Sequence, residues 1–486
     1  MALRPRRLPR GDRGAGRPAP ALSRQEESAL RVLKFGGTSV GDAEAILRLA
    51  AITRSRVSEP LLLVVSAVGH TTDALETAGR AAASGRLDDG LQVLRGLRRL
   101  HAGLAEELLE AAQERRSLLA HFDRDFASIE RLLGGLAAVE EFSPAVEDRL
   151  LHFGELLSSR LVSAALAARG LPSVWVDVRE LVVTESSHGG AEPLIEETGH
   201  RCREAFAPLL ARRLVPVTQG FIARDLSGAA TTLGRGGSDY TASLIGASLG
   251  AEEIEIWTDV DGIMTADPSL VPEARNIPVM SFREAAELAF FGARVLHPKT
   301  LAPAVERRIP VRVLNTRRAA GSGTVIFAEA PRDNRPVRSI AYKEGMILVH
   351  LVSARMFKAH GFLARLFEIL DRHGVVPDAL ATSEVSVAMA FQGCSALQGA
   401  LRELSKLGSV SVREGQAMVC VVGQGLREHP GIAGQVFEAL GKVPVSLISQ
   451  GGSEVALGFV IAESDLAAAV RSLHRRFFEE AAEAAA

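Results

Sequence analysis

Cysteine and long apolar runs are scarce in this sequence of 486 residues. The three cysteines, Cys202, Cys394 and Cys420, lie far apart and form no CxxC pair. This spacing argues against a structural zinc site and suits a reducing compartment. Apolar runs such as residues 61–65 are far too short to cross a bilayer. We therefore expect free thiols, a cytoplasmic location and no contact with the interior of a membrane.

An excess of charge of one sign is also missing. The 56 Lys and Arg residues nearly balance the 58 Asp and Glu residues, which gives a formal net charge of -2. No global field then attracts nucleic acid or an anionic membrane surface, so an anionic ligand must be held by local groups. With 47% hydrophobic residues the chain can build a large core, divided into two or three domains.

Residues 1–31 stand apart because they hold eight arginines and four prolines and show no helix or strand period. We predict a disordered Arg- and Pro-rich extension there. An Arg-rich, acid-poor leader is also typical of organellar transit peptides. The few serines and the several prolines favour an unstructured extension or an over-long start instead.

A glycine-rich stretch at residues 231–242 is the most informative part of the chain. Arg235 lies between Gly234 and Gly236 there, and Ser238 and Asp239 precede an apolar helix expected over residues 240–249. Glycines let the backbone approach a ligand, and either Ser238 or Asp239 is expected to cap the helix, whose amides then face an anion. Arg235 suits a carboxylate. An ordinary capped turn has the same features, so other motifs must support a site.

Two more glycine or hydroxyl turns follow short apolar strands near the N-terminus. Residues 32–35 run into Gly36-Gly37 before a helix over residues 43–51, and residues 61–66 run into a small polar turn. The first turn offers backbone amides to phosphate, and Lys34 adds a positive charge. Neither GxxxxGK nor GxGxxG occurs. Strands that alternate with helices predict an α/β sandwich with ligands at the carboxyl ends of the strands.

The middle of the chain gives weaker signals. Helical spacing over residues 90–136 predicts a pair of solvated helices with His101 and His121 on the surface. We expect Glu155 in the first turn of a helix that begins near residue 153, where the helix dipole favours a carboxylate. A strand that ends in Thr258-Asp259 suits an adenosine, although such a strand end is common without any ligand.

Two βαββα units follow a proline-containing linker at residues 328–338. The first spans residues 345–413, and the second, residues 414–478, lacks a closing strand. Since a sheet without one of its edge strands is incomplete, we expect residues 338–343 to cross over and supply it, which interlocks the two units. Residues 479–486 are expected to be a disordered tail.

Taken together, these motifs resemble aspartate kinases of the amino-acid kinase family, in particular the monofunctional kind with a tandem pair of ACT domains. The resemblance covers about residues 32–478 and rests on five ordered motifs: Lys34-Phe35-Gly36-Gly37-Thr38-Ser39, Phe153-Gly154-Glu155-Leu156, Gly234-Arg235-Gly236-Gly237-Ser238-Asp239, Trp257-Thr258-Asp259-Val260 and Phe291-Gly292-Ala293-Arg294-Val295-Leu296-His297-Pro298. It implies a three-layer αβα sandwich at residues 32–330, followed by two ferredoxin-like ACT modules.

The reaction so implied uses ATP and L-aspartate and gives 4-phospho-L-aspartate, the first step towards lysine, threonine and methionine. The β-carboxylate of aspartate is already a nucleophile at neutral pH, so the protein has to align the reactants and neutralise charge. Two alternatives stay open: a kinase of the same fold for another amino acid such as glutamate or N-acetylglutamate, and a non-catalytic ACT amino-acid sensor.

The resemblance also implies roles for single residues. Lys34 neutralises the transferring phosphoryl group, Asp239 holds Lys34 and the loops in register, and Arg235 binds the α-carboxylate of aspartate. The further substrate-binding residues are Glu155 for the α-amino group and Ser66, Thr72, Phe221 and Ser238 around the pocket. The further ATP-binding residues are Gly36, Gly37, Thr258, Asp259, Met264 and Arg294. Mg²⁺ bridges the ATP phosphates and needs no metal ligand from the chain. The lysine-sensitive pattern has Tyr, Arg and Lys where this sequence has Met264, Ser269 and Arg294.

An effector pocket between paired first ACT modules is implied as well, and with it a homodimer or tetramer formed through these modules. Its residues are Met356, Gly361, Phe362, Leu363, Asp378, Thr382, Ser383, Glu384 and Val385. Asp378 and Glu384 would bind an effector ammonium group. Ala359 and Val376 replace two serines of the lysine-sensitive pattern, so lysine is favoured as the effector and threonine stays open. Ordinary ACT packing would also account for these residues.

Overall fold

The structure is a computed structural model that describes residues 30–291, 298–331, 335–357 and 359–480. Its N-terminal half is built on an eight-stranded sheet in the order β3-β5-β2-β1-β8-β10-β11-β9. The strands are β1 Arg31–Phe35, β2 Leu61–Val65, β3 Ser173–Trp175, β5 Val215–Gln219, β8 Glu253–Thr258, β9 Val279–Ser281, β10 Val311–Asn315 and β11 Thr324–Phe327. The strands from β3 to β10 pair in parallel, so their carboxyl ends share one edge.

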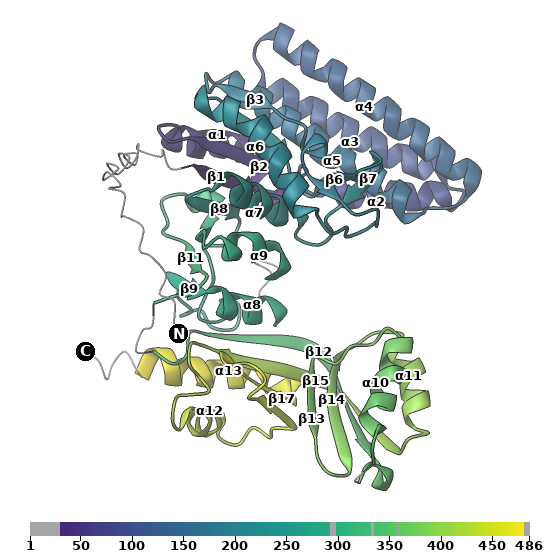
Figure 1. The fold of residues 1–486 in the computed structure, drawn as a ribbon, viewed down its shortest axis with the longest axis vertical. Coiled ribbons are helices and arrows are strands. Elements are labelled where there is room, and N and C mark those ends of the chain that lie inside the picture. The colour runs from purple at the N-terminus through teal and green to yellow at the C-terminus, as the bar shows by residue number, and fades with distance from the viewer. Residues whose placement is uncertain (1–29, 292–297, 332–334, 358, 481–486) are drawn as a thin grey trace, which may run out of the picture.

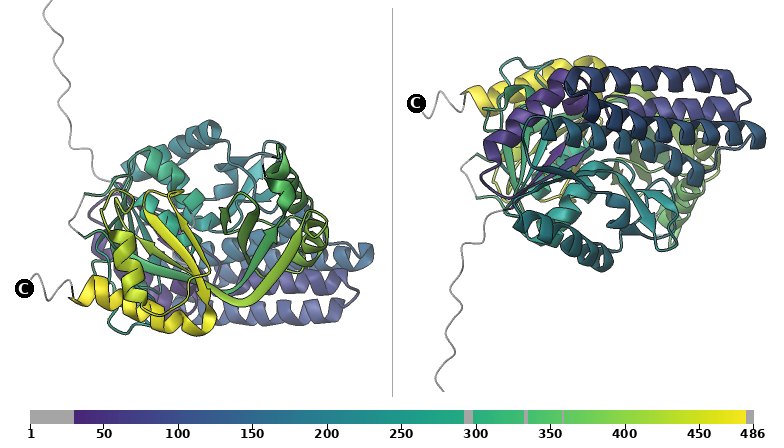
Figure 2. Two further views of the ribbon diagram at one scale, coloured as in Figure 1. Left: turned by 90° about the horizontal axis from the view of Figure 1, so that it is seen from below. Right: turned by 90° about the horizontal axis from the view of Figure 1, so that it is seen from above.

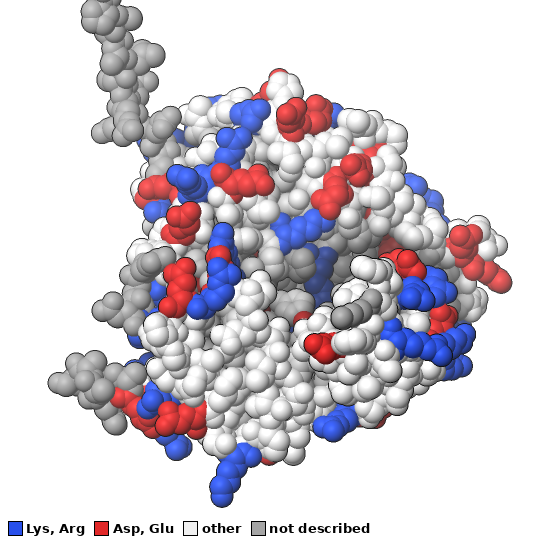
Figure 3. Space-filling model, turned by 60° about the horizontal axis from the view of Figure 1, so that its bottom comes forward, with Lys and Arg blue, Asp and Glu red and all other residues white. Residues whose placement is uncertain are grey.

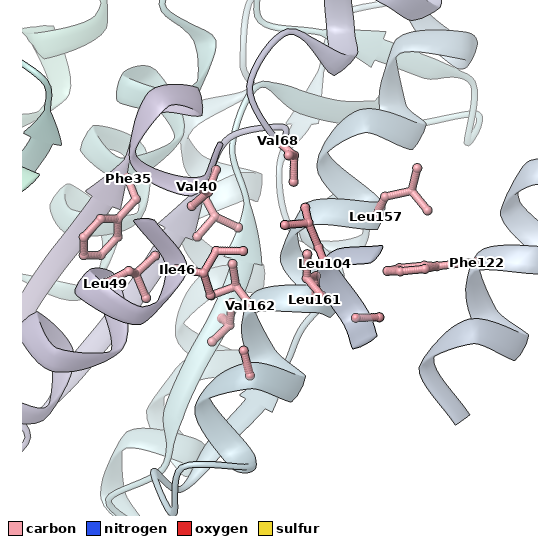
Figure 4. Packing of buried hydrophobic residues seen from close by; sticks show 14 of the residues in the cluster. Phe35, Val40, Ile46, Leu49, Val68, Leu104, Phe122, Leu157, Leu161 and Val162 are labelled. Carbon is pink, nitrogen blue, oxygen red and sulfur yellow. The ribbon is translucent and has the colours of Figure 1, made fainter. Parts of the chain in front are cut away.

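Helices cover both faces of this sheet, as the alternation of side chains along each strand requires. Leu33 and Phe35 of β1 point into one apolar cluster, whereas Val32 points into another. The first face carries α1 Ala43–Arg56, α2 Thr71–Ala83, α3 Leu87–Leu108, α4 Ala112–Val139 and α5 Pro144–Ala167; the second carries α6 Ile195–Ala211, α7 Gly237–Leu249, α8 Phe282–Phe290 and α9 Pro298–Glu306. Figure 4 shows the packing against β1 and α1 on the first face. The expected three-layer α/β sandwich is confirmed.

The helices α3 and α4 do not stand in solvent as a pair. They lie beside α2 and α5 in one layer (Figures 1 and 2), and their apolar faces belong to the core. His101 of α3 is consequently fully buried between Phe122 and Phe126, with its Nδ1 donating to the Leu97 carbonyl at 2.9 Å. Burial lowers the pKa of His101 to about 4. The surface position predicted for His101 is therefore wrong, whereas His121 is exposed as expected.

A second, three-stranded sheet stands beside α5. It consists of β4 Val183–Thr184, β6 Ile222–Asp225 and β7 Ala230–Thr232, in the order β4-β6-β7. The strand β7 leads directly into the glycine-rich stretch before α7. This small sheet therefore determines where that stretch lies.

The C-terminal half is a six-stranded antiparallel sheet in the order β13-β14-β12-β15-β17-β16. The strands are β12 Ser339–Val352, β13 Ala379–Thr382, β14 Ser386–Gln392, β15 Ser409–Val422, β16 Leu447–Gln450 and β17 Ala456–Ala462; the helices are α10 Phe362–Arg372, α11 Leu397–Leu404, α12 Ile432–Leu440 and α13 Leu466–His474. Two separate apolar clusters lie under this sheet, one with α10 and α11 and one with α12 and α13. Figure 2 shows the helices grouped at the two ends of the sheet.

The long strands β12 and β15 each run through both halves of this sheet. Residues 339–343 pair with residues 418–422 in the second half, and residues 346–352 pair with β14 in the first half. A register shift between Lys343 and Met346 separates the two parts of β12. The segment that precedes the first unit thus forms an edge strand beside the second.

Two expected boundaries differ from the structure. Leu30 is buried and Arg31 begins β1, so the predicted disordered extension is too long at residues 30–31, while residues 1–29 lie outside the described part. Glu479 and Glu480 continue the C-terminal helical segment, so the predicted tail also starts too early. Within the described ranges, no helix is both long and apolar enough to cross a bilayer.

Candidate active site

The candidate site lies where β1, β2 and β8 end. The Gly36 amide donates to the Trp257 carbonyl at 3.1 Å, and the Ser66 amide donates to the Phe35 carbonyl at 3.0 Å. These bonds hold the three strand ends together, and the first turn of α7 reaches the same edge, as the following contacts show. Motifs that are far apart in the sequence therefore meet here, as expected for parallel strands.

A buried ion pair joins the first strand to α7. The Nζ of Lys34 lies 2.6 Å from Oδ1 of Asp239, and the two residues are 9% and 8% exposed. The helix starts at Gly237, and its N-cap is Gly236 in the left-handed conformation, without a side-chain cap. The prediction that Ser238 or Asp239 caps α7 is therefore wrong. Both lie inside the first turn, where Ser238 accepts a hydrogen bond from Ser66 at 3.0 Å.

Close backbone packing holds the glycine turn beside the Lys34 ammonium group. A Cβ added at Gly37 would lie only 2.9 Å from the carbonyl oxygen of Gly69, so the turns after β1 and β2 touch through backbone. The Gly69 amide also donates to the Gly37 carbonyl at 3.1 Å. A Cβ at Gly36 would lie 3.6 Å from Nζ of Lys34. The absence of a side chain at Gly36 leaves this face of the ammonium group open.

Glu155 lies in the middle of α5, not in a first turn. The helix begins at Pro144 after Ser143, a start signal that the sequence analysis missed. Glu155 is fully buried and accepts from the Ala67 amide at 3.3 Å and from the Thr72 hydroxyl. Burial raises its pKa to about 8, although these hydrogen bonds act in the opposite direction. Its Oε2 has no hydrogen-bond partner among the described residues, so this oxygen is free to accept a bond from a ligand.

Gly154 is what allows α5 to approach so closely. A Cβ there would lie 3.1 Å from Cβ of Ala67 and 3.3 Å from Oγ1 of Thr72. The glycine and the glutamate therefore act together: one permits the contact, and the other places its carboxyl group at the end of β2.

Phe221 packs against the start of α7, and Arg235 directly precedes the N-cap of that helix. Phe221 has a φ of 66°, a conformation that is uncommon outside glycine, and its amide donates to Thr241 Oγ1 at 3.0 Å. A Cβ at Gly237 would lie 2.7 Å from the Phe221 ring, so the helix start fits only a glycine at that position. Arg235 is exposed between Gly234 and Gly236, whose φ angles are 73° and 70°.

A cavity of about 600 Å³ lies beyond the end of β8. Its lining residues are Asp259, Val260, Asp261, Gly262, Ile263, Met264, Ala266, Asp267, Pro268, Leu288, Phe291, Arg318, Ser339, Ile340, Ala341 and Tyr342. Asp259 and Met264 therefore line it, and Thr258 donates to the Asp259 carboxylate at 3.2 Å. Arg294 lies outside the described residues. The cavity is large enough for a nucleotide base and ribose.

One wall of this cavity belongs to the C-terminal half of the chain. The Ser339 hydroxyl donates to the Met264 carbonyl at 2.8 Å, and the Ile340 amide donates to the Thr265 carbonyl at 2.8 Å. Tyr342 donates to Asp267 at 2.9 Å. Sequence reasoning missed these contacts, because nothing local in β12 indicates that it touches a loop that precedes it by more than 70 residues.

Most of the predicted effector residues lie at one end of the first ACT-like unit, whereas Asp378 lies at the opposite end of the β13–β14 hairpin, beside Gln392. Gly361 is the left-handed N-cap of α10, and the Ser353 amide donates to the Val385 carbonyl at 2.8 Å, which joins the loop before α10 to the turn after β13. Thr382, Ser383, Glu384, Val385 and Leu363 are exposed, Met356 is half-buried, and Phe362 is buried in the core of the unit. Asp378 is already paired with Lys343 at 2.6 Å.

No group of three or more His, Cys, Asp or Glu side chains is arranged to hold a metal ion within the described ranges. The three cysteines are free thiols; Cys202 and Cys420 are buried, and Cys394 is exposed.

Comparison with known proteins identifies the family to which this fold and site are similar. A model described as the amino acid kinase family matches residues 29–315, and an ACT domain model matches residues 419–477. The lysine-sensitive aspartokinase 3 of Escherichia coli (strain K12) is 36% identical over 467 residues, which cover 93% of this chain and all of that protein. The chloroplastic aspartokinase 1 of Arabidopsis thaliana is 34% identical, over 94% of this chain and 82% of that protein.

Solved structures agree with these relatives. The fold matches E. coli aspartokinase III in complex with aspartate and ADP, at 37% identity and a TM-score of 0.78, over 93% of this chain and 100% of that one. The same enzyme in complex with lysine and aspartate gives a TM-score of 0.79 at the same identity and coverage. A catalytic sandwich and a regulatory sheet in one chain, with these matches over almost its entire length, show that the chain belongs to the aspartokinases of the amino acid kinase family.

Proposed function

We propose that the chain transfers the γ-phosphoryl group of ATP to the β-carboxylate of L-aspartate. A carboxylate oxygen attacks the γ-phosphorus, the bond from that phosphorus to the β-phosphate oxygen breaks, and the products are 4-phospho-L-aspartate and ADP. The observation that carries the proposal is the buried pair of Lys34 and Asp239 beside the open glycine turn. No proton has to be removed from the attacking group, so a catalytic base is not required.

Lys34 and the turn after β1 hold the phosphates. The ammonium group is fixed by Asp239 in a buried place, where a positive charge opposes the charge that develops on the transferring phosphoryl group. Gly36 and Gly37 allow the phosphates to approach the backbone amides. Mg²⁺ bound together with ATP would neutralise part of the phosphate charge, and no group of three or more His, Cys, Asp or Glu side chains among the described residues is arranged to hold it.

Aspartate is recognised at its two charged ends. Arg235 pairs with the α-carboxylate, and the unpartnered Oε2 of Glu155 accepts from the α-ammonium group. Ser66, Thr72, Phe221 and Ser238 complete the pocket. A free α-ammonium group is thus required, which disfavours N-acetylglutamate as a substrate.

The adenosine occupies the cavity at the end of β8. Thr258, Asp259 and Met264 are its contacts, and Arg294 is proposed to meet the phosphates. The bonds from β12 to the residues around Met264 support this assignment, because they keep the loop in a fixed position.

Regulation is assigned to the C-terminal half. We divide the chain into a catalytic domain at residues 32–330, a first ACT module at residues 345–413 and a second module made of residues 338–343 and 414–478. The first module binds the feedback amino acid, and lysine is preferred to threonine because an E. coli relative has been solved with lysine. Two copies pair through this module, and free thiols suit a cytoplasmic location.

The first prediction tests the phosphoryl-transfer site. Replacing Lys34 with Ala removes the positive charge beside the transferring group, so kcat should fall by about a thousandfold or more. Formation of ADP and of aspartyl phosphate is measured with purified protein. The matched control is Lys299→Ala, because Lys299 is an exposed lysine of α9 that pairs with Glu192; it should keep normal turnover.

The same assay separates the alternatives. Aspartate, glutamate and N-acetylglutamate are compared as acceptors, with added lysine, threonine and both. Turnover of glutamate in preference to aspartate would replace the substrate assignment. Binding of lysine without any aspartate-dependent ADP formation would support a sensor without catalysis, and normal turnover by Lys34→Ala would refute the assigned site.

A further inference from the structure

We infer that His188, held by the buried carboxylate of Asp148, is a positioning residue for Arg235 and so determines the affinity for aspartate. The inference rests on the proposed function, because it uses Arg235 as the group that binds the α-carboxylate. It concerns a segment, residues 185–191, that none of the five motifs contains.

The helix α5 presents three ionisable side chains on one face, spaced by four and three residues. Asp148, His152 and Glu155 follow the helical period, and all three are buried. Glu155 faces the end of β2, as described above. The other two face β7, so one helix supports both the start of α2, where Thr72 lies, and the strand that leads to Arg235.

Asp148 has donors on both of its oxygens. Its Oδ1 accepts from the Thr232 hydroxyl at 2.6 Å, and its Oδ2 accepts from His188 Nδ1 at 3.0 Å and from the Gly189 amide at 3.1 Å. The carboxylate is almost fully buried, so each of these bonds replaces hydration that the group has lost. Through Asp148 the loop of His188 is tied to β7.

Two further bonds make α5, β7 and this loop one unit. His152 Nε2 donates to the Thr231 carbonyl at 2.8 Å, and burial lowers the pKa of His152 to about 4, so the ring is neutral near pH 7. The Ala191 amide donates to the Thr232 carbonyl at 2.8 Å. The end of β7 is therefore fixed from two sides.

The loop then contacts the residue that precedes Arg235. A Cβ added at Gly234 would lie 3.1 Å from Cα of Gly190 and 3.3 Å from the Gly189 carbonyl oxygen. Arg235 itself is exposed, so packing of its own side chain does not fix it. Its position follows from the backbone between Thr232 and Gly236, and that backbone rests on the loop that His188 anchors.

Loss of the His188 bond should affect the two substrates differently. The loop would keep only the Gly189 amide as its tie to Asp148, and the carboxylate would lack one donor. Gly234 and Arg235 would lose support on the aspartate side of the site. The cavity proposed for the nucleotide is lined by residues between 259 and 268, by residues 339–342 and by Leu288, Phe291 and Arg318, which have no part in this network.

The test compares two variants of His188 with a matched control. His188→Leu removes the donor, whereas His188→Asn places an amide nitrogen near the position of Nδ1. The control is His200→Leu, because His200 is exposed on α6, where it pairs with Glu204 four residues along the helix. For each protein, kcat, the KM for aspartate, the KM for ATP and the melting temperature are measured.

His188→Leu should raise the KM for aspartate by about tenfold and change the KM for ATP by less than about twofold. His188→Asn should return the KM for aspartate to within about threefold of the wild type. An unchanged aspartate KM in His188→Leu overturns the inference, and so does an equal rise in the KM for aspartate and the KM for ATP. A His188→Asn variant that folds but keeps a raised KM for aspartate overturns it as well. If His188→Leu does not fold, Asp148→Asn, which turns an amide towards the donors, must raise the aspartate KM alone.

Failure of the inference is distinguishable from failure of the proposed function. A wild type that turns over aspartate together with an unaffected His188→Leu variant refutes the inference only. A wild type that forms no ADP in the presence of aspartate refutes the proposed function, and the inference with it.

Discussion

At the scale of single residues, Glu155 combines an unfavourable position with a proposed binding role. Its pKa is raised to about 8 because the carboxyl group is fully buried. In the unfolded chain it ionises near its ordinary pKa of about 4.5, so the native state holds one more proton between these two values. The free energy of unfolding is therefore highest, as far as Glu155 is concerned, below the unfolded pKa. It decreases as the pH rises towards 8.

Glu155→Gln should consequently stabilise the free protein while it weakens aspartate binding. The amide cannot ionise, so at pH 8 the variant should exceed the wild type in free energy of unfolding by at least about 1 kcal/mol, and the difference should shrink towards pH 5. The KM for aspartate should rise by about a hundredfold, because the amide cannot ionise to pair with the α-ammonium group when aspartate binds. Denaturant unfolding at several pH values and steady-state kinetics measure the two effects.

The exposed Glu204→Gln of α6 is the matched control, because its side chain is 68% exposed. It should change neither the pH dependence of stability nor the KM for aspartate. A Glu155→Gln variant that is less stable than the wild type at pH 8 would contradict the role given to burial.

Residue patterns predicted the glycine turns well and their surroundings poorly. Glycines and hydroxyls after short apolar strands indicated the turns at Gly36 and Gly234, since such turns need those residue types. The prediction that Ser238 or Asp239 caps α7 was wrong because Asp239 pairs with Lys34, which lies about 200 positions away in the sequence. The burial of His101 was missed for the same reason: helical spacing does not say what a helix packs against.

At the scale of elements, β12 connects the cavity that we propose for the nucleotide with the regulatory sheet. Burial alone would raise the pKa of Asp267, but hydrogen bonds from Ser269 and Tyr342 lower it. The pKa of Tyr342 is raised to about 12, by burial and by its bond to Asp267, so its hydroxyl stays a donor at every physiological pH. Asp267 thus fixes the loop to β12 and also orders its own turn through Ser269.

Tyr342→Phe removes one donor from this connection and little else. Stability should decrease by about 1 kcal/mol, the usual value of a single hydrogen bond. The KM for ATP should rise by about threefold, because the loop around Met264 becomes less fixed, while the KM for aspartate stays constant and serves as the internal control. Kinetics with each substrate varied in turn provide the measurement; a rise in the aspartate KM alone would contradict the assignment of this cavity to the nucleotide.

Element order was predictable from periodicity, whereas contacts between distant elements were not. The alternation of strands and helices predicted the α/β sandwich. The incomplete second βαββα unit predicted that residues 338–343 supply its missing strand. The start of α5 at Pro144 was missed, although Ser143 followed by proline is a helix-start signal. The wall that β12 adds to the cavity depends on tertiary packing, and no local pattern encodes it.

At the scale of the whole molecule, positive and negative charges nearly balance, whereas many of the exposed large apolar residues belong to one module. Figure 3 shows acidic and basic side chains interspersed on one face, with Lys or Arg side chains in the hollow near its centre. Exposed large apolar residues gather in the first ACT module: Val352, Phe357, Leu363, Phe367, Val376, Val385 and Val412. Leu363 and Phe367 are four positions apart on α10 and form an exposed stripe, as expected for a surface that pairs with another copy.

Phe367→Asp should therefore weaken self-association. A charge in an apolar contact is costly, so the variant should shift from dimer or tetramer to monomer at concentrations where the wild type is associated. Light scattering after size-exclusion chromatography measures the mass. Leu226→Asp, at a 70% exposed position of the catalytic domain, is the matched control and should leave the mass unchanged. A monomeric wild type would contradict the proposed pairing.

The two long strands also determine when the regulatory half can fold during synthesis. Residues 339–343 leave the ribosome well before residues 418–422, yet these two segments pair with each other. The N-terminal part of β12 therefore cannot form its backbone hydrogen bonds to β15 until about eighty more residues have been added. A pause in translation within that interval would leave an unpaired, aggregation-prone strand edge exposed next to a folded catalytic domain.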